Sequence, residues 1–233
     1  MYYQIIPKRD YQFSLENTIM LFKNIGSARE KLTLKNIFAG AFNYKYIIDC
    51  DKDNRINFYL WISDSVNQDA AVNAVTVWLA NKAVVFKSNA VLKEYSVVDT
   101  LYDYESAGGK NKKLSAFTNE TVFMNILAML QPRTRIVIGF RVTDISLKEK
   151  NNFRFGRGGT DVEIEALIQV SGDSKYSRTN VMNIAGSICS LTADERRLSV
   201  KFKNKFMPIK LSGSEFANIF QLPTLFRKDE DTV

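Results

Sequence analysis

Apolar residues in the first 89 positions follow two different periods. Some segments alternate apolar and polar side chains with a period of two, which predicts strands, and others repeat apolar residues at helical spacing. Ser14 is suited to cap the first of the helices. The predicted strands span residues 2–6, 44–50, 56–62 and 83–87, and the predicted helices span 14–25 and 69–79.

The same order of elements recurs in the second part of the chain. Pro132 stops a helix that Thr118 or Asn119 can cap, and Val181–Ile188 has the apolar spacing of another helix. The predicted strands span residues 91–104, 135–142, 161–170 and 198–202. After them, Ser212 and Glu215 form a capping box ahead of a short apolar run, which predicts a last helix.

The order strand–helix–strand–strand–helix–strand, read twice, predicts an α+β protein of two ferredoxin-like (βαββαβ) repeats with antiparallel sheets. We assign residues 1–89 to the first repeat, 90–207 to the second, and 208–233 to a C-terminal capped helix and charged tail. Two helices cover one side of each predicted sheet, so the other side is either exposed to solvent or covered by the second sheet or a partner domain. Tyr59 and Trp61 point to that side. RNA-recognition modules stack bases on aromatic residues of the corresponding sheet face. The more common arrangement is that the two sheets, or a partner domain, cover one another.

Composition excludes several kinds of chemistry. The chain has no histidine and only two cysteines, which removes Ser-His-Asp and Cys-His catalysis and the usual zinc, copper and haem ligand sets. The Gly108-Gly109-Lys110 sequence lacks the spacing of a phosphate-binding loop. We therefore assign no catalytic residue, metal site or cofactor, and expect a protein that is not an enzyme. No signal peptide or membrane span is readable, and the cysteines suit a reducing cytoplasm.

The positive charge of the chain is concentrated in one segment. The formal net charge is +7, and residues 110–157 hold ten Lys or Arg against three acidic residues, whereas the remaining 22 basic and 22 acidic residues balance. Aromatic residues interleaved with arginine and glycine over 153–159 can stack on unpaired bases while guanidinium groups meet phosphates. The alternative is a hairpin loop whose arginines serve solubility. The candidate nucleic-acid-binding residues are Lys110, Lys112, Lys113, Lys148, Lys150, Phe153, Arg154, Phe155 and Arg157.

Arg135 and Arg141 have a structural interpretation. We expect them to face Glu163 and Glu165 across an antiparallel strand pair, where opposite charges contribute about 0.2–1 kcal/mol each.

The closing segment runs from Ile209-Lys210-Leu211-Ser212 through Glu215-Phe216-Ala217 to Leu222-Pro223-Thr224. It resembles a short sequence motif in conjugative DNA-transfer ATPases of type IV secretion systems and related helicase-like ATPases. In that family the motif lies at the end of the region before the motor domain, and leucine usually stands where this chain has Phe216. No phosphate-binding loop or Walker B-type strand follows it here. The resemblance implies the pre-motor region alone, which would not hydrolyse ATP.

The resemblance implies a non-catalytic assembly or DNA-guiding module of a conjugative DNA-transfer machine. Its expected partners are single-stranded DNA and proteins of that machine, and a homo-oligomer is compatible with this role. The alternative is a freestanding single-stranded nucleic-acid-binding protein that uses the basic aromatic segment.

Overall fold

The computed structural model describes residues 1–8, 14–27, 42–79, 83–89, 92–103, 120–144, 162–174, 177–191, 198–199 and 208–220. Within them the fold is α+β, with a nine-stranded antiparallel sheet and five helices. The candidate nucleic-acid-binding residues predicted from the sequence all lie outside these ranges.

The first half of the chain has the predicted order of elements. It contains β1 (Tyr2–Pro7), α1 (Leu15–Ser27), β2 (Tyr44–Cys50), β3 (Ile56–Ile62), α3 (Gln68–Leu79) and β4 (Ala83–Ser88). Strand β1 lies between β3 and β4, and β2 pairs with the other edge of β3, all antiparallel. The predicted hairpin of β2 and β3 is confirmed, and a turn over residues 51–55 connects its strands.

The second half repeats this pairing pattern. It contains β5 (Val97–Asp103), α4 (Glu120–Met129), β6 (Thr134–Asp144), β7 (Glu163–Gly172), α5 (Arg178–Leu191) and the short β8 (Leu198–Ser199). Strand β5 lies between β7 and β8, and β6 pairs with the other edge of β7. The strand predicted over 91–104 begins too early, because residues 92–96 lie outside the strands and β5 starts at Val97.

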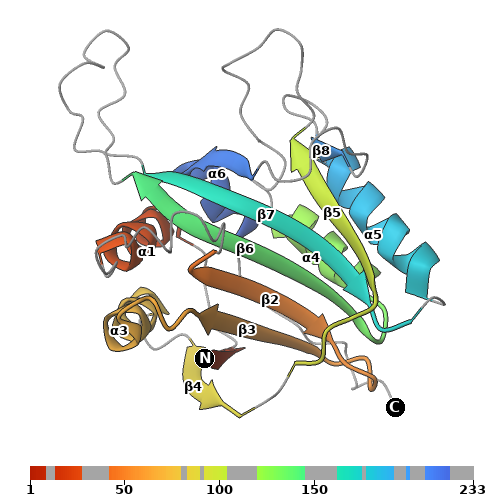
Figure 1. Ribbon diagram of the computed structural model, residues 1–233, viewed down its shortest axis with the longest axis horizontal. Coiled ribbons are helices and arrows are strands. Elements are labelled where there is room, and N and C mark those ends of the chain that lie inside the picture. Colours follow the sequence, from red (N-terminus) through yellow and green to blue (C-terminus); the bar gives the residue numbers. More distant parts are fainter. Residues whose placement is uncertain are drawn as a thin grey trace, which may run out of the picture.

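The two halves join edge to edge. Strands β2 and β6 pair antiparallel from Tyr44 opposite Phe140 to Cys50 opposite Thr134, and we call this pair the junction. The strand order is β4-β1-β3-β2-β6-β7-β5-β8, so the halves share one sheet. The interpretation in which two sheets cover one another is therefore wrong (Figure 1).

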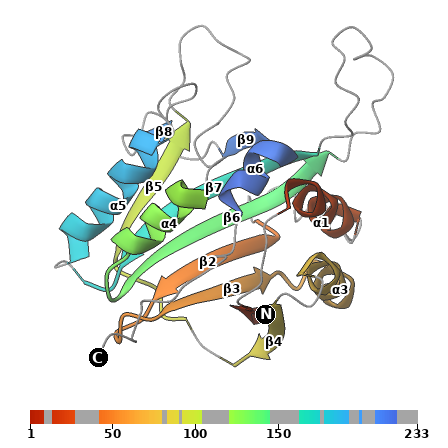
Figure 2. The same cartoon turned by 180° about the vertical axis from the view of Figure 1, so that it is seen from behind.

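All described helices lie on one side of this sheet. Figure 2 shows them in front of the strands, and Figure 1 shows the opposite side, where no described helix lies. We call this opposite side the open face. Buried side chains such as Ile48, Ile138 and Ile168 face the helices, and the residues between them point to the open face. No helix in the described ranges combines the length and apolar character needed to cross a membrane.

The closing segment of the chain is built into the core. Ser212 caps α6 (Gly213–Ile219) in the predicted capping box, with its side chain accepting from the Glu215 amide and the Glu215 carboxylate accepting from the Ser212 amide. A strand that the sequence analysis did not predict, β9 (Ile209–Ser212), precedes the helix and pairs with β7. Four residues are too few to show a clear period.

Aromatic side chains from α6 fill the helix side of the junction. Phe216 and Phe220 are 0% and 1% exposed. The Phe220 ring centroid lies 4.6 Å from that of Tyr46 on β2 and 5.6 Å from that of Phe140 on β6. Phe22 of α1 packs 5.1 Å from Phe216 by the same measure. The short last helix therefore contacts both halves of the chain.

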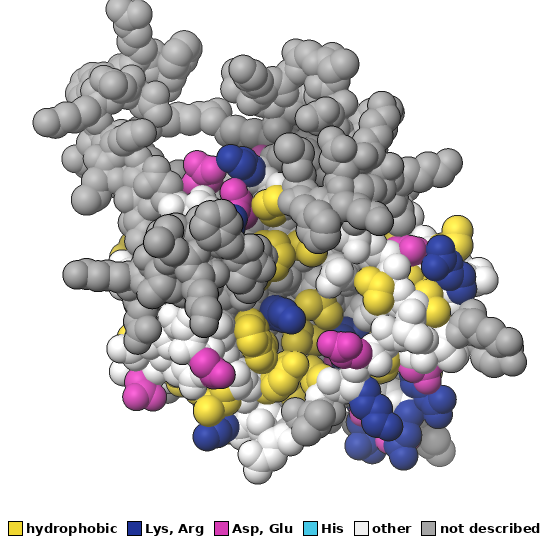
Figure 3. Space-filling view, in the orientation of Figure 1, with side chains coloured by type: hydrophobic (Ala, Val, Ile, Leu, Met, Phe, Trp, Pro, Cys, Tyr) yellow, Lys and Arg dark blue, Asp and Glu magenta, His cyan; other side chains and the backbone are white. Residues whose placement is uncertain are grey.

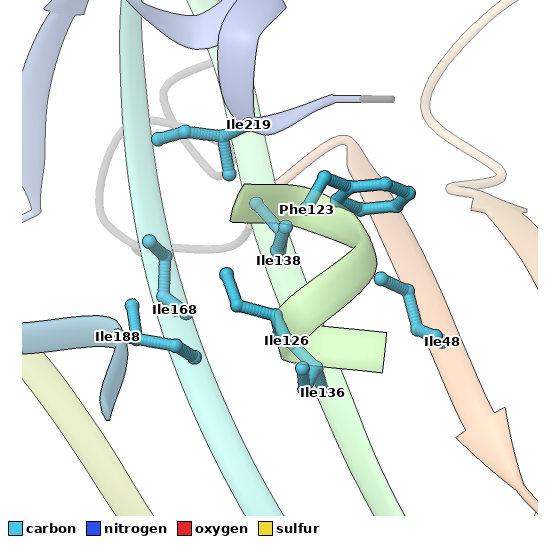
Figure 4. Close-up of a pocket in the computed structure, with 8 residues that line it drawn as sticks. All are labelled: Ile48, Phe123, Ile126, Ile136, Ile138, Ile168, Ile188 and Ile219. Atoms are coloured by element: carbon cyan, nitrogen blue, oxygen red, sulfur yellow. The ribbon is translucent and has the colours of Figure 1, made fainter. Parts of the chain in front are cut away.

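One small cavity lies in the core on the helix side of the sheet. A cavity of about 20 Å³ lies between the sheet and α4, α5 and α6 (Figure 4). Apolar side chains alone line it, so a water molecule inside would find no polar partner. Its lining residues are Ile48, Phe123, Ile126, Ile136, Ile138, Ile168, Ile188 and Ile219.

Candidate binding surface on the open face

A buried ion pair lies on the open face at one end of the junction. Asp49 and Arg135 are register partners, and Arg135 Nε donates to Asp49 Oδ1 at 2.7 Å. Their side chains are only 10% and 9% exposed. The pairing expected between Arg135 and Glu163 is wrong, because the β6–β7 register places Ser171 opposite Arg135.

Residues 92–96 cover this ion pair. The Lys93 carbonyl accepts a 2.7 Å hydrogen bond from Arg135 Nη1, and the Arg135 guanidinium lies 4.3 Å from the centroid of the Tyr95 ring. Tyr95 Oη lies 3.5 Å from Asp49 Oδ1. We call Asp49, Arg135, Tyr95 and the Lys93 carbonyl the clasp. It ties the connection between β4 and β5 to the junction.

Burial and charge in the clasp shift the titration of nearby phenols. Burial raises the pKa of Tyr95, and the Asp49 carboxylate raises it further, while Arg135 acts in the opposite direction. Burial is also the largest cause of the raised pKa of Tyr59, where Asp49 and Asp51 raise the pKa further and Arg135 lowers it. Tyr59 is 8% exposed, so its ring is not available as a stacking surface.

Other carboxylates of the open face also have basic neighbours. The predicted pairing of Arg141 with Glu165 is confirmed, with Arg141 Nε 2.7 Å from Glu165 Oε2. Lys210 of β9 lies 3.9 Å from Glu163. Asp49, Glu163 and Glu165, three carboxylates of this face, therefore each lie beside a basic side chain.

A row of neighbouring residues across the open face contains aromatic side chains and one lysine. Tyr2, Trp61, Lys45 and Gly139 are successive register partners across β1, β3, β2 and β6. The Lys45 ammonium lies 5.0 Å from the centroid of the Trp61 ring. A Cβ atom added to Gly139 would come within 2.9 Å of Phe42 Cδ2, so the Phe42 ring lies directly against the β6 backbone. We call Tyr2, Trp61, Lys45 and Phe42 the aromatic row.

The aromatic row is partly accessible. Each of its four residues has intermediate exposure. No carboxylate of the described residues lies within salt-bridge distance of the Lys45 ammonium. Figure 3 shows hydrophobic side chains gathered in the middle of the open face with a basic side chain among them.

The described carboxylates and thiols show neither a cluster of metal ligands nor an activated thiol. No three of their cysteine, aspartate and glutamate side chains converge as metal ligands do. Burial raises the pKa of both thiols to about 11, and Asp51 and Asp49 add to the shift at Cys50. Thiols with such pKa values are poor nucleophiles at neutral pH.

Local sequence pattern predicts these features only in part. The alternation of β3 placed Tyr59 and Trp61 on the face away from the helices, but it carried no sign that Tyr59 is buried. The contacts of Tyr95 depend on a connection that the sequence analysis assigned to a strand, and the pairing of Asp49 with Arg135 depends on how the two halves join. Neither is readable from local pattern.

Comparisons of the chain with protein-family models, curated proteins and solved structures found no significant match.

Proposed function

We propose that this chain is a non-catalytic assembly or DNA-guiding module of a conjugative DNA-transfer machine of the type IV secretion class. The observation that carries the proposal is the open face, which combines partly exposed aromatic rings with Lys45, a lysine that has no carboxylate of the described residues within salt-bridge distance. These are features of a binding surface. The resemblance of residues 209–224 to the region before the motor domain of such ATPases suggests the machine.

The strand pairings support the finer interpretation of the fold as two ferredoxin-like repeats. In each half the first strand lies between the third and fourth, and the second pairs with the third. A βαββαβ unit has this arrangement. Two such units joined through their second strands would form one wide sheet with helices on one side, which leaves the other side for partners.

A genetic experiment tests this function. Deletion of the coding region in its natural host should abolish transfer of a marked mobile element between cells, and expression of the wild-type chain should restore it. Neighbouring relaxase or secretion genes, or a motor domain encoded in the same reading frame, would support the proposal. Undiminished transfer after deletion, or an unrelated operon, would contradict it.

The concentration of positive charge in residues 110–157 favours a second candidate, a freestanding single-stranded nucleic-acid-binding protein. Binding of an oligonucleotide should then weaken with salt, with a log–log slope of about −0.7 for each phosphate contacted. Replacement of Lys148, Lys150, Arg154 and Arg157 together by serine should remove most of the affinity. Undiminished affinity in this variant would contradict the assignment of binding to that segment.

A further inference from the structure

We propose that the aromatic row on the open face is a stacking site for the bases of a single-stranded nucleic acid. The inference deepens the DNA-guiding part of the proposed function and rests on it. It places base contact on the sheet face that the sequence analysis associated with Trp61, and not on the basic aromatic residues within 110–157.

The geometry of the row suits stacked bases. Tyr2 and Trp61 are register partners on adjacent strands, and directly opposite side chains in an antiparallel pair have Cβ atoms about 4.5–5.5 Å apart. Phe42 lies beyond Lys45, where Gly139 allows its ring to approach the β6 backbone. Aromatic rings presented across a sheet are a common platform for unpaired bases, because every base has a π-face.

Charge complementarity selects a polyanion as the occupant. The carboxylates of the open face named above each have a basic neighbour, whereas Lys45 has an aromatic ring beside it. A phosphate next to a stacked base can therefore approach Lys45 without displacing a carboxylate. The net charge of +7 favours the same class of ligand.

Tryptophan fluorescence of the wild-type chain gives the first test. The chain has two tryptophans, and Trp78 is 8% exposed and packs against Phe220 on the helix side of the sheet. Titration with oligodeoxythymidylate of about 20 nucleotides at low ionic strength should quench the remaining tryptophan, Trp61. Binding detected by the anisotropy of a labelled oligonucleotide without any quenching would overturn the inference.

Matched variants give the second test. Trp61→Ala should weaken binding by roughly fivefold to 150-fold, the range measured for loss of one base–aromatic stack, whereas Trp61→Phe should keep most of the affinity. Lys45→Gln should weaken binding and reduce the salt slope by about 0.7. Lys87→Gln, an equal change of charge on β4, should do neither. Lys87 is exposed and lies on the helix side of its strand.

The outcomes separate this inference from the proposed function. If Trp61→Ala is misfolded by circular dichroism, the Trp61→Phe and Lys45→Gln comparison still decides. Undiminished binding by Lys45→Gln, or an equal loss in Lys87→Gln, would refute the aromatic row and leave a DNA-guiding module with its site elsewhere. No binding by the wild-type chain would refute both the row and the DNA-guiding role.

Discussion

The two sides of the junction hold the same pair of strands together by different means. On the helix side, Phe140 and Tyr46 pack against Phe220 in a closed aromatic cluster. On the open face, Asp49 and Arg135 form a buried ion pair. The backbone hydrogen bonds of β2 and β6 are common to both sides, so the side chains alone account for the difference.

The two sides of the junction therefore affect different properties, the stability of the strand pair on one side and its register on the other. Apolar packing is non-directional, and a strand can slip by two residues while it keeps the same side chains on the same face. An ion pair has a preferred geometry, and a slip of two residues would place Val137 or Arg133 opposite Asp49. We infer that the aromatic cluster supplies most of the stabilising free energy at the junction and that the clasp specifies its alignment.

The largest effect is expected on the helix side. Phe220→Ala should lower the free energy of unfolding by about 4 kcal/mol, because it removes a buried ring and leaves a cavity between the two halves. Urea unfolding followed by circular dichroism measures the change. Phe86→Ala is the matched control, since Phe86 is 41% exposed, and its loss should stay within about 0.5 kcal/mol. Equal losses in the two variants would contradict the central role of α6.

The clasp should give the next largest effect. Asp49→Ala leaves the Arg135 guanidinium buried without its carboxylate, which should cost about 3 kcal/mol. Replacement of both residues by leucine should cost much less, because the unpaired charge is then absent. The double-mutant cycle is measured by urea unfolding. Additive losses would show that the two side chains do not act as a unit.

These two regions also mark how far the sequence alone could lead. The period of two placed Tyr46 and Ile48 on one face of β2, and the capping box of Ser212 and Glu215 ahead of an apolar run predicted the last helix. Local pattern could not show that β2 pairs with β6, because that choice depends on two strands 84 residues apart finding each other. The aromatic row needs the pairing of β1 with β3 and the contact of Phe42 with Gly139, which are also long-range.

Alkaline pH should weaken the helix side of the junction through the Cys50 thiol. Burial raises the pKa of the Cys50 thiol from 9.0 to about 11, so folding favours the neutral thiol. This contribution is complete below about pH 9 and is lost as the pH rises from 9 to 11. The urea midpoint should fall over that window, and less steeply in Cys50→Ala. Tyr3, Tyr59 and Tyr95 also have raised pKa values and decrease stability above pH 10 in both proteins. Parallel curves would exclude the thiol as the cause.

The smallest expected effect comes from the turn that leads into the junction. Arg133 has a φ of 62°, a left-handed conformation that is unfavourable for a residue with a Cβ atom, and its amide donates to the Cys50 carbonyl at 2.8 Å. Arg133→Gly should raise the free energy of unfolding by about 0.5–1 kcal/mol, measured by urea unfolding.

The side chain of Arg133 contributes little stabilising free energy that Arg133→Gly would remove. Its guanidinium lies 3.1 Å from Asp173, but the arginine side chain is 60% exposed, and exposed pairs contribute about 0–1 kcal/mol. Asn54, with a φ of 60° in the neighbouring turn, is the control, because asparagine tolerates this conformation and Asn54→Gly should gain less. A loss of stability in Arg133→Gly would mean that the ion pair with Asp173 contributes more free energy than the relief of the left-handed conformation.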